Sequence, residues 1–326
     1  MKRTVKLGSV AALSLVMAAC GNNANSNSTT NSSATSVMES GATNATTESS
    51  GVSCEKTSEE DIAALFDRWN DDLKSGDPAN VAENYATDSV LLPTVSNKVR
   101  FSADEKKDYF AHWLEKKPSG VVNKRWIELD CNHAVDTGVY TFTYGDGSKV
   151  PARYTFVYGV EGGEWKILTH HSSAMPVAGA DTDMPPADMS TGSPPPATDV
   201  DGCATVHAGD MDKKIGAWSD ALSSGDAAAV VKHYAQDSVL IAPDSNEMLM
   251  TAAEKEQYFK QLMEKQPTLT MDDHWTSFEC NAATDSGLYT MTFADGTTTK
   301  GRFTSTYRWN GAEWEITSQH ASVMPE

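Results

Sequence analysis

Two histidines stand at matching places near the ends of two similar stretches of the chain. The first stretch, WKILTHHSSAMP, contains His171, and the second, WEITSQHASVMP, contains His320. Residues that alternate with these histidines, and so share a strand face with them, are nearly unchanged, whereas His170 on the opposite face becomes Gln319. We therefore predict that His171 and His320 point inward, toward a pocket, and that His170 points outward. No metal role is expected, because adjacent strand residues face opposite ways and no third ligand follows at a regular spacing.

An arginine in the preceding strand pattern also recurs. Arg153 lies in ARYTFVY and Arg302 in GRFTSTY, and a guanidinium inside a strand is costly to bury without a partner. One interpretation is that each arginine binds the carboxylate of a small acidic ligand. The alternative for each arginine is a structural ion pair with an aspartate. The alternative for each histidine is a role as a core residue that hydrogen-bonds to the backbone or to a serine. The candidate aspartates are Asp88 and Asp237 or Asp136 and Asp285.

An acid and a base in one hollow would make it catalytic. Asp88 and Asp237 precede a strand pattern, so they are either turn caps or buried acids with raised pKa values. Together with His171 and His320 they are the candidate catalytic residues of an isomerase or dehydratase, in which an arginine would anchor an anion. Aromatic residues are candidates for the ligand-binding wall or for the core. These are Trp69, Tyr85, Trp218 and Tyr234.

The elements that must position these residues occur twice. Each matched pair is 149 positions apart, and this offset holds without a gap from Cys54–Pro176 to Cys203–Pro325. We therefore predict two tandem domains, residues 54–176 and 203–326. Residues 177–202, rich in Pro, Ala and Asp, are predicted to be the linker.

Within each repeat, helix signals come first and strand signals follow. TSEE opens a helix that Gly76 ends, Asp77-Pro78 begins a short helix that runs through Tyr85 to about Ala86, and SADE opens a third. Four stretches rich in β-branched and aromatic residues follow, with turn residues between them. This order predicts an α+β fold, with N-terminal helices packed on one face of a curved antiparallel sheet.

The ordered motifs YATDSVLL, YFAHWLEKKP, GVYTFTY and GEWKILTHHSS resemble the association domain of calcium/calmodulin-dependent protein kinase II and its stand-alone bacterial relatives. These belong to the nuclear transport factor 2-like superfamily, with SnoaL-like polyketide cyclases and ketosteroid isomerase. The resemblance implies two cone-shaped domains, each with a pocket in its hollow. It also implies self-association through sheet faces, as an intrachain pseudo-dimer or a homo-oligomer.

Kinase activity does not follow from this resemblance. The chain has no Gly-rich nucleotide loop and no HRD or DFG motif, so it is not a kinase. It also has no GxGxxG dinucleotide fingerprint, and we predict no cofactor.

The cysteines indicate an exported protein. One pair occurs in each repeat, which allows three pairings, and the repetition favours Cys54–Cys131 and Cys203–Cys280. The fifth, Cys20, follows a basic segment and a short apolar run, so residues 1–19 have the pattern of a secretory signal.

The ending of that signal resembles a bacterial lipobox. The resemblance implies lipidation of Cys20 and anchoring in the cell envelope, at the outer membrane if the cell has one. Residues 20–53, mostly Asn, Ser, Thr, Ala and Gly, are predicted to be a disordered tether.

The charge of the chain narrows its partners. Its 26 basic and 45 acidic residues give a net charge of −19, which disfavours binding to nucleic acids and to anionic lipid head groups. We therefore expect the chain to contact the membrane only through the predicted lipid on Cys20. We expect a non-catalytic binding and association module that self-associates and can hold a small acidic ligand in each cone. The alternative is a SnoaL-like isomerase, dehydratase or cyclase that uses a pocket Asp/His pair.

Overall fold

The computed structural model describes residues 53–177, 179–181, 184–186, 203–205 and 209–325. The predicted signal peptide, the lipidation site Cys20 and nearly all of the predicted tether lie outside the described residues, as does most of the predicted linker. No helix in the described ranges is long and apolar enough to cross a membrane.

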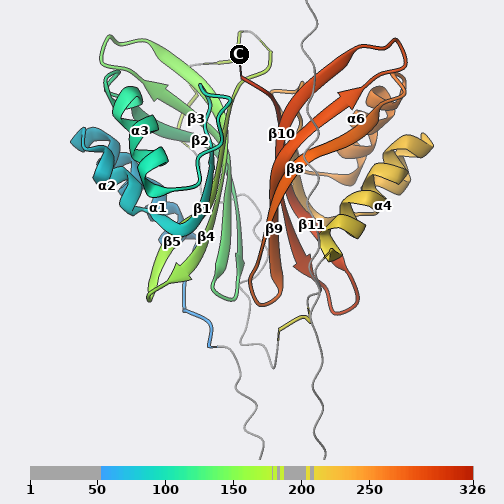
Figure 1. The fold of residues 1–326 in the computed structure, drawn as a ribbon, viewed down its shortest axis with the longest axis horizontal. Helices are drawn as coiled ribbons and strands as arrows, with labels where there is room; N and C mark the ends of the chain where they lie inside the picture. The colour runs from blue at the N-terminus through green and yellow to red at the C-terminus, as the bar shows by residue number, and fades with distance from the viewer. Residues whose placement is uncertain (1–52, 178, 182–183, 187–202, 206–208, 326) are drawn as a thin grey trace, which may run out of the picture. The chain divides into compact units, whose positions relative to one another are not determined.

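The first repeat has three helices and a five-stranded sheet (Figure 1). Its helices are α1 (Glu59–Ser75), α2 (Pro78–Glu83) and α3 (Ala103–Leu114). Its strands are β1 (Tyr85–Leu92), β2 (Ser119–Asp130), β3 (His133–Thr143), β4 (Lys149–Glu161) and β5 (Glu164–Ala174). The strand order β1-β5-β4-β3-β2 leaves one face of the sheet to the helices (Figure 1).

The second repeat has the same order of elements. Its helices are α4 (Asp210–Ser224), α5 (Ala227–Val231) and α6 (Ala252–Met263). Its strands are β6 (Tyr234–Ile241), β7 (Met248–Leu249), β8 (Thr268–Phe278), β9 (Ala282–Thr292), β10 (Thr298–Trp309) and β11 (Trp314–Val323). The short β7 is an addition at the edge of a sheet ordered β7-β6-β11-β10-β9-β8.

The predicted helix boundaries of the first repeat arise from local capping. Ser58 Oγ accepts a hydrogen bond from the Asp61 amide, and the Asp61 carboxylate accepts one from the Ser58 amide, which forms a capping box at the start of α1. Gly76 ends the helix with a φ of 74°. Helix α4 differs, because Gly209 stands at its N-cap and gives no side-chain hydrogen bond.

Two details of the predicted fold are wrong. The first and last strands of each repeat pair in parallel, so the sheets are mixed rather than antiparallel. Tyr85 and Tyr234 begin strands and do not lie on helices, because α2 and α5 end before them and the chain then joins the last strand through Tyr85↔Ile167 and Tyr234↔Ile316. Short-range signals favour a longer helix here, and pairing with a distant strand overrides them.

The two predicted disulfides are confirmed. Cys54 joins Cys131 and Cys203 joins Cys280, each across 77 positions. Each bond ties the segment before the first helix to the turn between the second and third long strands of its repeat.

Three clusters of buried side chains hold the fold. One lies between helices and sheet in each repeat. The third contains side chains of both repeats, on the sheet faces that the helices leave free: Trp126, Val135, Val239 and Ile241, with Met248 and Met250 against them. The repeats therefore pack against each other through their sheets, as the predicted pseudo-dimer requires.

Candidate functional site

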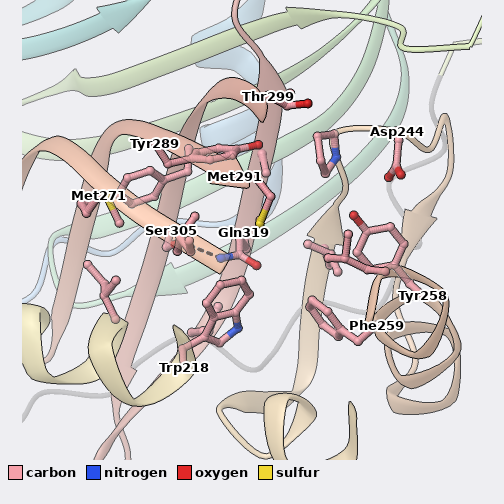
Figure 2. A pocket seen from close by; sticks show the side chains of 18 of the residues that line it. Trp218, Asp244, Tyr258, Phe259, Met271, Tyr289, Met291, Thr299, Ser305 and Gln319 are labelled. Carbon is pink, nitrogen blue, oxygen red and sulfur yellow. Dashed lines mark hydrogen bonds between the residues drawn. The ribbon is translucent and has the colours of Figure 1, made fainter. Parts of the chain in front are cut away.

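The hollow of the second repeat contains an open cavity. Its volume is about 260 Å³, and its walls come from α4, α6 and the concave face of the sheet (Figure 2). The lining side chains are mostly apolar or aromatic. They include Trp218, Leu240, Phe259, Leu262, Leu269, Met271, Tyr289, Met291, Phe303 and Ile316. A cavity of this size and lining suits a small, largely apolar molecule.

The equivalent hollow of the first repeat is nearly full, with a space of about 20 Å³. The difference follows from three matched positions. Phe66, Trp113 and Phe156 fill the first hollow, and the residues 149 positions later are smaller. Those later residues are Ile215, Leu262 and Ser305, and all three line the open cavity. The Phe156 ring packs 5.5 Å from Trp69 and 4.0 Å from His170, centroid to centroid.

Polar groups of the open cavity are few and ordered by one chain of hydrogen bonds. The Trp218 indole donates to the Tyr234 hydroxyl at 3.3 Å, and that hydroxyl donates to Oε1 of Gln319. Gln319 then turns its Nε2 toward Ser305 Oγ, at 3.4 Å (Figure 2). The amide nitrogen has a second N–H, so the cavity offers a hydrogen-bond donor to an occupant.

Charged groups of the lining stand at its exposed margin. Asp244 and Lys265 line the cavity but their side chains are exposed. Burial, together with the neighbouring Asp244 carboxylate, raises the pKa of the Tyr258 hydroxyl. The inner wall therefore has no ionised group to match a charge on a ligand.

In the first repeat, His170 points into the hollow, and the prediction that it points outward is wrong. Its Nδ1 lies 2.8 Å from the Tyr85 hydroxyl, and its ring stacks on Phe156. Burial lowers the pKa of His170 to about 3, so the ring is neutral. Trp69 also lines this hollow, where it packs as a core residue.

His171 and His320 lie on the other face of their sheets, where the two repeats meet, so their predicted place in a pocket is wrong. Their rings stack at 3.9 Å and an angle of 10°. Nε2 of His171 is 2.9 Å from Ser322 Oγ, and Nε2 of His320 is 2.8 Å from Ser173 Oγ. Ser173 and Ser322 are themselves 149 positions apart, so the two contacts are related by a pseudo-twofold axis.

Arg153 and Arg302 make the same kind of contact and bind no ligand in a hollow. Arg153 donates to the carbonyl oxygens of Ala242 and Ser245 in the second repeat. Arg302 donates to the matching carbonyls in the first repeat. These belong to Pro93 and Ser96, at 2.8 and 3.2 Å. Both arginines are buried, and burial lowers their pKa values to about 10, so they remain cationic at neutral pH.

The predicted acid–base constellation does not assemble. Asp88 is exposed on β1, whereas Arg153 and His171 are buried at the contact between repeats. Asp237 accepts a hydrogen bond from Arg308 at 3.0 Å. The predicted ion pairs of Arg153 and Arg302 with aspartate are also absent from the described residues, since both arginines bind carbonyls.

Asp136 and Asp285 have other partners. Arg125 Nε lies 3.1 Å from Asp136, and His274 Nδ1 lies 2.9 Å from Asp285. Arg125 and His274 are 149 positions apart, so a guanidinium in one repeat is replaced by an imidazole in the other.

Comparison with known proteins identifies both repeats. The family model of the calcium/calmodulin dependent protein kinase II association domain matches residues 58–176, and a SnoaL-like domain model matches residues 213–326. A crystal structure named for such an association domain, from Xanthomonas campestris, is 53% identical, covers 37% of this chain and 90% of its own, and has a TM-score of 0.36. This chain belongs to the association-domain family.

Further solved structures have lower identity to this association-domain protein. An NTF2-like protein with a cystatin-like fold from Novosphingobium aromaticivorans is 16% identical, covers 35% of this chain and 80% of its own, and has a TM-score of 0.32. A structure named as an NTF2-like dehydratase from Streptomyces avermitilis is 14% identical, covers 36% and 96%, and has a TM-score of 0.33. The search of curated proteins found no match to the chain.

Both repeats bury a lysine that the sequence reasoning missed. Lys106 Nζ donates to the Ser89 and Phe101 carbonyls, and burial lowers its pKa to about 8. Lys255 makes the matching bonds to Ser238 and Met250. A lysine at the same place in both helix patterns was the available signal. Each one fixes the loop before its helix and does not line either hollow.

No metal site emerges from the geometry. Within the described ranges, no group of three or more His, Cys, Asp or Glu side chains is arranged to hold a metal ion. The polar groups that the open hollow of the second repeat offers are hydroxyls and one amide, which suit an organic ligand better than a cation.

The stacked histidines make stability depend on pH. Burial, and then the neighbouring cations, lower the pKa values of His171 and His320 well below 6.5. The unfolded chain therefore binds more protons as pH falls below about 6.5, and each histidine subtracts up to about 1.4 kcal/mol of unfolding free energy per pH unit. Between about pH 6 and pH 5, the double variant H171Q/H320Q should show a slope smaller by about 2.5 kcal/mol per unit than the original chain.

Urea unfolding at several pH values measures that slope. The comparison between variants is needed because other buried groups titrate in the same window, including Glu128, whose pKa burial raises to about 7. The single variant H171Q should remove about half of the difference. Equal slopes in all three proteins would contradict the burial of a neutral pair.

Proposed function

We propose that this protein is a non-catalytic binding protein of the cell envelope, in which the first repeat is a scaffold and the second holds a small, neutral, largely apolar molecule. The observation that supports this is the difference between the two hollows, about 260 Å³ against about 20 Å³. The two repeats share one fold and differ at the place where a ligand would bind. In the first repeat, aromatic side chains fill that space.

The chemistry of the lining refines the ligand. An acidic ligand was expected from Arg153 and Arg302, but both are used between the repeats. The cavity interior instead offers apolar walls and the N–H of Gln319. A molecule with an apolar body and a carbonyl or ether oxygen fits this arrangement, because the oxygen would accept a hydrogen bond in a site without charge.

The location is part of the proposal. Two disulfides indicate folding in an oxidising compartment. The predicted signal and lipobox at Cys20 would place the pair of domains on the outer side of the membrane, joined to it by the tether. The isomerase or dehydratase alternative has lost its support, because Asp88, Arg153 and His171 do not surround one hollow.

Filling the cavity tests the proposal. The variant S305F replaces Ser305 with phenylalanine. The matching position of the first repeat, Phe156, already has this residue. Titration with Nile red, a neutral apolar fluorophore, should give saturable binding to the original chain. The variant S305F should weaken that binding at least about tenfold, since a ring inside the cavity removes the space that the dye needs.

A matched control separates the cavity from the surface. The variant T298F adds the same ring at an exposed position of β10 and should bind Nile red as the original chain does. The proposal would be wrong if S305F bound the dye as tightly as T298F. It would also be wrong if the original chain showed no saturable binding.

A further inference from the structure

One histidine joins the helical wall of the cavity to the sheet of the second repeat. His274 on β8 lies between two carboxylates: its Nε2 is 3.0 Å from Asp212 of α4, and its Nδ1 is 2.9 Å from Asp285 of β9. Asp285 is fully buried, whereas the Asp212 side chain is 62% exposed. The two contacts therefore differ in how easily water can replace them.

The first repeat has different residues at the two matching places. Arg125 at the matching place is a permanent cation that contacts Asp136, and the residue that matches Asp212 is Ala63. A titratable group and a second carboxylate thus occur together in the repeat that has the open cavity.

Helix α4 differs from α1 in how its first turn is capped. It begins at Asp210 without a side-chain cap, whereas α1 has a full capping box. It also supplies Ile215 and Trp218 to the wall of the cavity. A change in how its first turn is held would alter access to the space behind those two side chains.

We propose that His274 is a pH-dependent latch that holds α4 closed over the cavity when its imidazole is protonated and releases the first turn of α4 when it is neutral. An imidazolium donates one N–H to each carboxylate, whereas a neutral imidazole has a single N–H. The buried Asp285 retains that proton, because it has less access to water, and the exposed Asp212 turns to solvent. The inference rests on the proposed binding site and describes its regulation.

The groups around His274 set the direction. Burial lowers its pKa, but the hydrogen bond and charge of Asp285, with the charges of Asp212 and Asp273, outweigh burial and raise it above 6.5. Asp285 also accepts a hydrogen bond from Thr276, and burial raises its own pKa to about 6. The latch is therefore closed near neutral pH and opens as pH rises through the raised pKa of His274.

Hydrogen exchange on the full chain tests the latch without any ligand. Exchange of the amides of α4, corrected for the intrinsic effect of pH, should be about fivefold faster at about pH 8.5 than at about pH 6.5, the size expected for loss of a half-exposed ion pair. The variant H274R has the permanent cation of the first repeat and should exchange slowly at both values. The variant H274Q should exchange fast at both.

A second readout follows the cavity. The association rate of Nile red should change with pH as the exchange of α4 does, and H233Q should behave as the original chain because His233 lies outside the bridge. Flat exchange across this range, or an H274R variant that responds to pH like the original chain, would overturn the latch. If α4 responds as expected but the dye never binds, the latch stands and the proposed ligand site is wrong.

Discussion

Replacing Phe156 with serine should destabilise the protein by about 4 kcal/mol, as removal of a fully buried aromatic ring does in other cores. Phe156 is inaccessible to solvent and packs against Phe66, Trp69, Tyr154 and His170. Ser305 occupies the matching position in the second repeat, where the sheet tolerates it beside an open cavity. In the first repeat the same serine would leave a void among side chains that are arranged to fill it.

The void should also change the titration of His170. Burial lowers the pKa of this ring to about 3, and its closest aromatic neighbour is Phe156, at 4.0 Å between centroids. Water that enters the space in F156S should raise the pKa of His170 toward 6.5. Urea unfolding measures the lost stability, and the pH dependence of the ring proton resonances measures the pKa.

An exposed phenylalanine provides the control. Phe278 is 38% exposed at the end of β8, so F278S should cost less than about 1 kcal/mol. The account of the filled hollow would be wrong if F156S cost no more than F278S, or if His170 kept its low pKa in F156S.

The sequence predicted those parts of the fold that depend on local signals or on the repeat. Ser58 and Gly76 bound α1 because capping hydrogen bonds and a left-handed glycine act within a few residues. The pairing of Cys54 with Cys131 followed from its repetition at Cys203 and Cys280. The parallel pairing of β1 with β5 did not follow, because it joins residues about eighty positions apart and leaves no mark on either segment.

The position of the functional site could be predicted only in part. Alternation separated His170 from His171 onto two faces, and the structure has them on two faces. Alternation cannot tell which face meets the helices, since both faces of these strands are buried. The face that is the same in both copies was assigned to the pocket, but it is the face where the copies meet.

Symmetry explains why that face is unchanged between the repeats. A contact around a pseudo-twofold axis uses one patch twice, so a change at Ser173 affects the partner of His320 just as a change at Ser322 affects the partner of His171. The hollows make no such contact and were free to differ. Comparing Phe66 with Ile215 and Phe156 with Ser305 at the 149-residue offset would have located the open cavity from the sequence alone.

Replacing both interface arginines with methionine should cost about 5 kcal/mol and uncouple the two repeats. Arg153 donates to two backbone carbonyls of the other repeat and Arg302 donates to three, and a buried carbonyl that is left without a donor costs about 1–3 kcal/mol. Methionine keeps most of the volume, so the loss reports on hydrogen bonds more than on packing. In R153M/R302M, calorimetry should resolve two transitions in place of one, because each repeat has its own core and its own disulfide.

A surface ion pair between the same repeats is the matched control. Lys124 contacts Glu247 at 3.1 Å with both side chains largely exposed, so K124M should change stability by less than about 1 kcal/mol and keep a single transition. The single variants R153M and R302M should be similar to each other, because their contacts are related by the pseudo-twofold axis. A single transition in R153M/R302M at the temperature of K124M would mean that the apolar cluster around Trp126 and Ile241 holds the repeats together without the arginines.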